Sequence, residues 1–188
     1  MNTNLTSGEI VLGSTQRTLI NSLSFYVCWF ATAYGVAGGY SWVGPVMIGL
    51  YLLLHWLFIQ YSRAEMVFIL IGGFMGYGAD NFFLFTGTVD YLGSDLLGLA
   101  PYWMLFVWFS FLSLFHVSLQ WLRERCILAA VLGGLGGPLS YHWADTIGAF
   151  TLGEPYLQSL FVLGAVWGVI TPFLFWLSSQ RIFDRNST

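Results

Sequence analysis

Apolar residues fill most of the chain in six blocks, which short polar or glycine-containing segments separate. The blocks run over residues 18–38, 42–61, 65–86, 101–122, 126–149 and 157–178. Each is close to the ~20 residues that an α-helix needs to cross ~30 Å of hydrocarbon. No block alternates apolar and polar residues as the strands of a membrane β-barrel do. The pattern predicts an all-α fold, a polytopic transmembrane helix bundle of about six spans in a single integral membrane domain over residues 1–188.

Composition supports a lipid environment for this bundle. Of the 188 residues, 57% are hydrophobic and 8% are charged, and the mean hydropathy is +0.72. A soluble domain carries roughly 25% charged residues, because its surface must be covered with polar groups. Aromatic residues make up 19% of the chain, and Trp and Tyr favour the membrane interface. The N-terminal segment lacks a basic residue before Arg17 and a small-residue cleavage site, so we expect the first span to remain as a signal anchor.

All six basic residues are arginines, and the predicted topology puts them on one side of the membrane. They are Arg17, Arg63, Arg123, Arg125, Arg181 and Arg185. The loops on the other side carry Asp90, Asp95 and Glu154 and no basic residue. The positive-inside rule then predicts that both termini lie in the cytoplasm, in a bacterial inner membrane. The chain has no basic tract for nucleic acid, so the expected partner is the lipid bilayer.

Four pairs of glycines have the GxxxG spacing that lets membrane helices approach closely. The pairs are Gly35 and Gly39, Gly72 and Gly76, Gly133 and Gly137, and Gly164 and Gly168. We interpret them as helix packing inside one bundle, and the alternative is contact between copies in a homo-oligomer.

Ionisable groups inside a span cost a few kcal/mol, so each one requires a partner or a function. Asp80 lies about fifteen residues into the third span, or ~22 Å, which predicts a place in the outer half. In the fifth span, Tyr141, His142 and Asp145 are spaced to share one helix face near the outer interface. Pro138 in the same span interrupts the helical hydrogen bonds and frees backbone carbonyls.

These residues define a candidate polar site between the third and fifth spans. It comprises Asp80, Asn81, Pro138, Ser140, Tyr141, His142 and Asp145. Two interpretations remain open. The groups are either hydrogen-bonded or wet structural groups, or they line an outward-facing pocket for an ion, a proton or a lipid headgroup.

Other chemical signals are weak. His55 and His116 are predicted at similar depths near the cytoplasmic interface, which makes them weak candidates for binding haem or a metal. Cys28 and Cys126 are far apart and are interpreted as small apolar residues. The chain lacks an HxxxxD, a Walker lysine and a GxSxG motif. We therefore predict no cofactor and no metal, and we favour a non-enzyme while the catalytic question stays open.

Several short motifs resemble a proteobacterial family of small inner-membrane proteins that is catalogued as a domain of unknown function. The matching residues are Gly44-Pro45, Asp80, Ala100-Pro101, Trp103-Met104, Ser118-Leu119, Trp121-Leu122, Gly136 to Tyr141 and Gly148-Ala149. The family has Asn-His before the serine of the fourth span, whereas this chain has His116-Val117, so the family gives this histidine no role. Genes of the family often lie near genes resembling cyclopropane-fatty-acid synthases. The resemblance therefore implies a membrane-lipid context.

Four hypotheses for function follow. The first is a partner or scaffold for a membrane-lipid enzyme, in lipid modification or envelope homeostasis. The second is a small transporter or flippase with its polar site between spans three and five. The third is a membrane enzyme that uses Asp80, His142 and Asp145 for acid–base chemistry. The fourth is an accessory subunit of a larger membrane complex.

Overall fold

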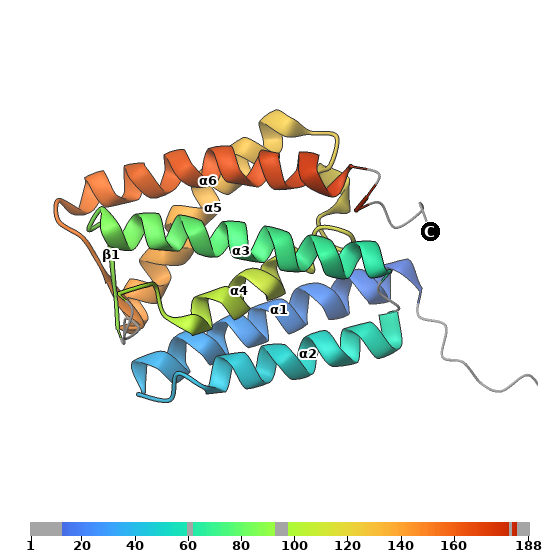
Figure 1. The fold of residues 1–188 in the computed structure, drawn as a ribbon, viewed down its shortest axis with the longest axis horizontal. Coiled ribbons are helices and arrows are strands. Elements are labelled where there is room, and N and C mark those ends of the chain that lie inside the picture. Colours follow the sequence, from blue (N-terminus) through green and yellow to red (C-terminus); the bar gives the residue numbers. More distant parts are fainter. Residues whose placement is uncertain (1–12, 60–61, 93–97, 181, 184–188) are drawn as a thin grey trace, which may run out of the picture.

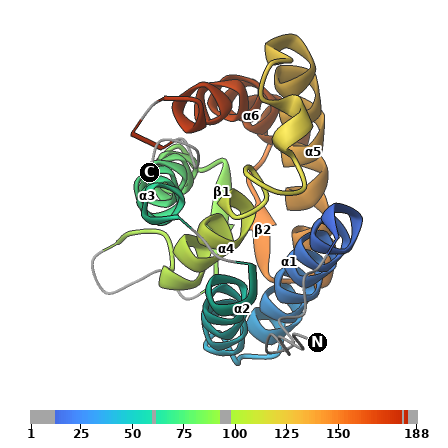
Figure 2. The same cartoon turned by 90° about the vertical axis from the view of Figure 1, so that its right-hand side faces the viewer.

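The computed structural model describes residues 13–59, 62–92, 98–180 and 182–183, and these form a bundle of six α-helices (Figure 1). The helices are α1 (Ser14–Ala37), α2 (Val43–Ile59), α3 (Arg63–Phe85), α4 (Tyr102–Leu112), α5 (Cys126–Ile147) and α6 (Tyr156–Ser178). Seen along the bundle, α4 lies among α1, α2 and α3, and α5 and α6 close the opposite side (Figure 2). The predicted all-α polytopic bundle is confirmed.

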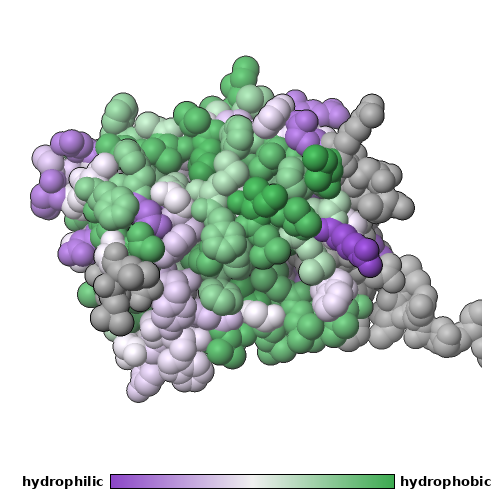
Figure 3. Space-filling model, in the orientation of Figure 1, coloured by the Kyte–Doolittle hydropathy of each residue, from purple (hydrophilic) through white to green (hydrophobic). Residues whose placement is uncertain are grey.

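The lengths and surfaces of the helices fit an apolar solvent. Three helices, α1, α3 and α6, are long and apolar enough to cross a membrane, and α2 and α4 contain shorter apolar helices. Large apolar side chains face outward, with Ile127 82%, Leu157 78% and Phe161 76% exposed. On the face shown in Figure 3, hydrophobic residues fill the middle of the bundle and hydrophilic residues gather toward its two ends.

Local chemistry sets several helix boundaries. The Ser62 side chain accepts a hydrogen bond from the Glu65 backbone N–H at 3.2 Å, which caps the start of α3. Pro101 immediately precedes α4. Proline has no backbone N–H, but at the start of a helix no helical hydrogen bond requires one. Gly148 ends α5 in the left-handed region with φ +85°, which glycine adopts without steric cost.

The predicted fourth span, residues 101–122, is not one helix. The α-helix ends at Leu112, turns follow, and a short 3-10 helix, η1, covers Gln120–Leu122. The Ser113 hydroxyl donates to the Ser110 carbonyl at 2.6 Å, an alternative to continued helix. Buried Asn21 of α1 donates to the Ser113 carbonyl at 3.2 Å, and the Tyr51 hydroxyl lies 2.7 Å from Ser113 Oγ. These side chains supply hydrogen bonds at the point where the helix ends inside the bundle, including one to the Ser113 carbonyl.

Two short strands that the hydropathy pattern did not predict join one end of the bundle. Strand β1 (Val89–Tyr91) follows α3, and β2 (Phe150–Leu152) follows α5. They pair antiparallel, with Asp90 opposite Thr151. Three residues are too few for a periodic signal in the sequence, and only the tertiary arrangement brings the two segments together. The pairing ties the ends of α3 and α5.

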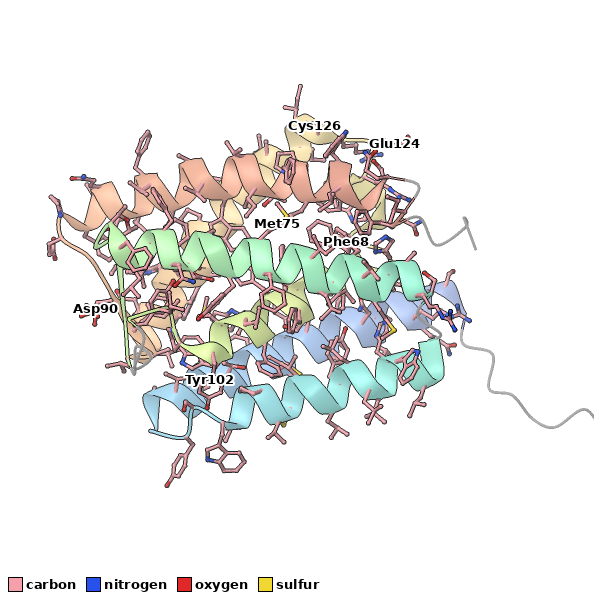
Figure 4. All side chains as sticks on the ribbon, viewed as in Figure 1. Phe68, Met75, Asp90, Tyr102, Glu124 and Cys126 are labelled. Atoms are coloured by element: carbon pink, nitrogen blue, oxygen red, sulfur yellow. The ribbon has the colours of Figure 1, made fainter. Side chains whose placement is uncertain are left out.

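The charged residues divide between the two ends of the bundle. Four arginines lie at one end, Arg17 and Arg63 in the first turns of α1 and α3, and Arg123 and Arg125 just before α5. Figure 4 shows Asp90 at the strand end and Glu124 at the opposite end. Asp95, Arg181 and Arg185 lie outside the described residues.

Glycines bring two pairs of helices into close contact. On α3, a Cβ at Gly76 would lie 2.0 Å from the Trp108 ring of α4, and a Cβ at Gly72 would lie 2.8 Å from Leu112. On α5, a Cβ at Gly137 would lie 2.2 Å from the Trp167 ring of α6.

The other predicted packing glycines differ in their surroundings. A Cβ at Gly133 would lie 2.3 Å from Thr171, and one at Gly164 would lie 3.0 Å from the Gly134 carbonyl oxygen. A Cβ at Gly35 would lie 3.1 Å from the Tyr40 carbonyl oxygen, whereas one at Gly168 would have its nearest neighbour at 3.6 Å. Gly39 lies beyond α1 with open space around it.

Replacing Gly76 with alanine is expected to destabilise the bundle by about 1–3 kcal/mol, because the added methyl overlaps the Trp108 ring. The control is Gly78→Ala, two residues further along the same helix, where an added Cβ meets nothing within 4 Å. This variant should be as stable as the parent protein or more stable. Thermal unfolding in detergent measures both, and equal midpoints for the two variants would contradict the close packing of α3 on α4.

Candidate functional site

The most constrained polar group in the bundle is the carboxyl group of Asp80, on α3. Asp80 is 0% exposed. The Tyr91 hydroxyl of β1 and the Tyr141 hydroxyl of α5 both donate to Oδ1, the former at 2.5 Å. The Trp108 indole N–H of α4 donates to Oδ2 at 2.5 Å. A carboxylate accepts on both oxygens, so three donors from three elements match the ionised group.

Tyr91, the donor from β1, stays protonated. Burial first, and then the charge of Asp80, raise the pKa of the Tyr91 phenol well above its usual value. Tyr91 therefore remains a hydrogen-bond donor at physiological pH, and it fixes β1 to the buried end of α3.

Asn81, the neighbour of Asp80, faces a different partner. Its Nδ2 donates to the Tyr77 carbonyl at 2.8 Å, and its Oδ1 accepts from the Ala100 backbone N–H at 3.0 Å. The Tyr77 hydroxyl donates to the Ala100 carbonyl. Asn81 therefore holds the segment that leads into α4.

The candidate residues of α5 separate into two groups. Only Tyr141 reaches Asp80. His142 is exposed and its Nδ1 hydrogen-bonds to the Tyr156 hydroxyl, and Asp145 Oδ1 accepts from the Leu152 backbone N–H at 3.3 Å. His142 thus contacts the start of α6 and Asp145 contacts β2, and neither contacts Asp80.

Pro138 and Ser140 affect the backbone hydrogen bonding of α5. Pro138 is inside α5, which remains helical through it. The Gly134 carbonyl, four residues earlier, has lost its helical donor and faces Gly164 of α6. The Ser140 hydroxyl donates to the Gly137 carbonyl at 2.7 Å. The Pro138 ring also lies near Gly164, so the interrupted turn of α5 packs on α6.

The two remaining histidines are buried on separate aromatic neighbours. The His55 ring packs edge-on against Tyr51, and the His116 ring packs edge-on against Phe68. Among the described residues, no group of three or more His, Cys, Asp or Glu side chains could hold a metal ion.

A cavity of about 530 Å³ lies between α1, α4, α5 and α6. The described residues that line it are mostly apolar and include none with a charge. Twelve of the lining residues are aromatic, and they are Phe25, Tyr26, Trp29, Phe30, Trp103, Trp108, Phe111, Tyr141, Trp143, Phe150, Trp167 and Phe175. The lining part of α5 runs from Leu132 to Ala144, or about 18 Å at 1.5 Å per residue. The cavity is therefore elongated and apolar.

The mouth of the cavity is on the apolar outer surface. Lining residues of α1 and α5 are also widely exposed, with Tyr26 58%, Phe30 44%, Leu139 57% and Trp143 56% exposed. Figure 2 shows α5 inclined across the bundle, so that its later part comes beside α1. The opening therefore lies between α1 and α5.

The cavity wall and the buried carboxyl group share two residues. Trp108 and Tyr141 line the cavity and donate to Asp80. The Trp108 ring also stacks on Trp167, with centroids 4.8 Å apart and an angle of 13°. Asp80 does not line the cavity, so it acts on the wall by positioning these side chains.

Sequence reasoning identified Asp80 and Tyr141 but missed Tyr91 and Trp108, because nothing in their spacing links them to Asp80. It also missed the cavity. Its aromatic walls are scattered over four helices, and a high aromatic content was the only signal available.

A family model described as a protein of unknown function, DUF2878, matches residues 18–173, and the chain therefore belongs to this family. The predicted membership of a family of unknown function is confirmed. No curated protein matches the chain, and no solved structure matches it.

Replacing Asp80 with asparagine is expected to destabilise the fold by about 1–3 kcal/mol, because the amide N–H₂ faces a donor and leaves it unsatisfied. The matched control is Asp90→Asn, at the exposed middle position of β1, which should have little effect. Thermal unfolding in detergent measures the difference. An unchanged midpoint for Asp80→Asn would show that the three hydrogen bonds contribute nothing to stability.

Proposed function

We propose that this DUF2878 protein is a multi-pass protein of a bacterial inner membrane that binds the hydrocarbon chain of a membrane lipid. The observation that carries the proposal is the elongated, uncharged cavity between α1, α4, α5 and α6, with its mouth on the apolar surface. A water-filled site would require polar walls, whereas hydrocarbon chains from the bilayer match these.

The size of the cavity favours a single chain. An apolar protein cavity of roughly 150 Å³ accommodates a benzene molecule. The cavity here, at about 530 Å³, is several times larger and extends along α5. These dimensions suit one long chain better than a compact ring or a whole double-chain lipid.

The mouth of the cavity favours a lipid over a partner helix. Helices α1 and α5 contact each other, with Cα atoms within 8 Å. Packed helices have axes 8–10 Å apart, so a third helix does not fit between two that already touch. A hydrocarbon chain is thin enough to enter beside such a contact.

A lipid-binding cavity supports the role of partner or scaffold in membrane-lipid modification or envelope homeostasis. The chain lacks the catalytic motifs considered above, so a separate enzyme would act on the lipid that this protein holds. The transporter hypothesis has less support, because Asp80 accepts three hydrogen bonds and does not line the cavity. Nothing in the geometry specifically favours an accessory-subunit role.

The topology is tested by fusing alkaline phosphatase or green fluorescent protein to the C-terminus. Because the described arginines gather at one end of the bundle, we expect both termini in the cytoplasm. The phosphatase fusion should be inactive and the fluorescent fusion bright. A phosphatase fusion truncated after Leu92 is the positive control, and an active C-terminal phosphatase fusion would overturn the orientation.

Filling the cavity tests lipid binding. Gly136 lines the cavity, and an added Cβ meets nothing within 4 Å, so Gly136→Leu adds bulk at the cavity wall without a clash. The variant should retain several-fold less co-purified lipid than the parent protein, measured by mass spectrometry of extracts after delipidating washes.

Gly78→Leu is the control, because Gly78 is also exposed on a helix with open space but does not line the cavity. Leucine favours helix over glycine, so neither variant should unfold more easily. Equal lipid retention by both variants would contradict lipid binding in the cavity.

A further inference from the structure

The two helices that border the cavity mouth carry arginines at the same end of the bundle. Arg17 lies in the first turn of α1, and Arg125 immediately precedes α5. The Ser118 hydroxyl, in the connection between α4 and α5, donates to the Thr18 carbonyl of α1 at 3.0 Å. This contact holds the connection beside the start of α1, so the two arginines lie on neighbouring segments.

The Arg125 side chain is exposed and rests on an aromatic ring. Its guanidinium carbon lies 5.5 Å from the centroid of the Trp121 ring, and Trp121 is itself 51% exposed. Within the part of the chain that the structure describes, the Arg125 side chain takes part in no hydrogen bond or ion pair. Its N–H donors therefore remain for an oxyanion outside the protein, such as a phosphate.

One side of α5 leads from Arg125 to the cavity. The Arg125 carbonyl accepts the Ala129 N–H at 2.8 Å, so this residue is part of the first helical turn. Three cavity-lining residues, which are 43%, 57% and 56% exposed, follow Arg125 by about two, four and five helical turns. They are Leu132, Leu139 and Trp143. The arginine and the exposed part of the cavity wall therefore share one helix face.

The distance along this face suits the depth of a membrane lipid. From Arg125 to Leu132, the first lining residue of α5, the helix rises about 10 Å at 1.5 Å per residue. The headgroup region on each side of a bilayer is about 5–7 Å thick. A phosphate at Arg125 therefore places the first methylene groups of its lipid at the cavity mouth.

We propose that the cavity binds one acyl chain of an anionic phospholipid whose phosphate contacts Arg125. This inference rests on the proposed lipid binding and names the class of headgroup. The second acyl chain stays in the bilayer, against the apolar outer surface. In the proposed topology Arg125 is on the cytoplasmic side, so the lipid comes from the cytoplasmic leaflet. Basic sites between helices on that side are suited to anionic headgroups.

The charges at the two ends of the mouth favour this orientation. The segments beside the arginine end, residues 14–17 and 113–125, contain three arginines and one acid, Glu124. The strand end carries acids and none of the described arginines, and these acids are Asp90, Asp145 and Glu154. An anionic headgroup is therefore attracted to the arginine end and repelled from the strand end.

Native mass spectrometry of the purified full chain in detergent compares phosphatidylglycerol with phosphatidylcholine that has the same acyl chains. Phosphatidylcholine keeps the phosphate but has no net charge. We expect the parent protein to bind phosphatidylglycerol several-fold more tightly. Glycerol 3-phosphate, which has the phosphate and no acyl chain, should bind far more weakly. If it binds as tightly as phosphatidylglycerol, the site takes a free anion and the inference is overturned.

Arg125→Gln should weaken binding of phosphatidylglycerol about fivefold, the value of one arginine at a membrane surface, and leave phosphatidylcholine nearly unchanged. Arg125→Lys keeps the charge and should retain most of the preference. The matched control is Arg63→Gln, which removes the same charge from an exposed residue at the same end. Arg63 begins α3, across the bundle from α1 and α5 (Figure 2), so binding of both lipids should be unchanged.

The outcomes separate this inference from the proposed function. Equal losses for Arg125→Gln and Arg63→Gln would show a general attraction to the basic end. Equal binding of the two lipids by the parent protein would show no headgroup preference. Either result overturns the Arg125 contact while lipid binding in the cavity stands. If Gly136→Leu binds both lipids as the parent does, no acyl chain occupies the cavity and both proposals fail.

Discussion

The hydrogen bonds that converge on the Asp80 carboxyl group constrain the rest of the structure. A carboxylate buried in an apolar bundle is strongly unfavourable unless donors surround it. Here the donors come from β1, α4 and α5, and each must be held in place by its own element. The requirement to satisfy one group on α3 therefore fixes the positions of three other elements at the strand end of the bundle.

Helix packing around this cluster is uneven, and the unevenness creates the cavity. Glycines allow α3 to pack tightly on α4 and α5 to pack tightly on α6. The parts of α1 and α5 that line the cavity instead carry large aromatic side chains, including Tyr26, Phe30 and Trp143. A long apolar space remains between these helices, α4 and α6.

The carboxyl cluster and the cavity are parts of one arrangement. Trp108 and Tyr141 donate hydrogen bonds on one side and form the cavity wall with their rings on the other. Their orientation, and hence the shape of the wall, depends on a residue that no ligand in the cavity touches. A polar group deep in a membrane protein usually suggests transport or catalysis. In this bundle the geometry assigns Asp80 to positioning two side chains of the apolar cavity wall.

The sequence by itself determined the all-α class, the places of the apolar helices and the family, because hydrophobic length and short motifs are local properties of the chain. It also singled out Asp80, since a charge within an apolar block is conspicuous, and the glycines that pack α3 and α5. It did not determine the end of α4 at Leu112, where Asn21 and Tyr51 from other helices supply the hydrogen bonds that make a break tolerable.

Only the tertiary structure decided which residues meet. It separated His142 and Asp145 from Asp80, although all three were predicted to share one site, because His142 bonds to the start of α6 and Asp145 to β2. It also assembled the cavity from four helices, and this depends on helix tilt and on side chains distant in the sequence. Hydropathy is a property of single residues, whereas a cavity is formed only where residues from several elements pack together.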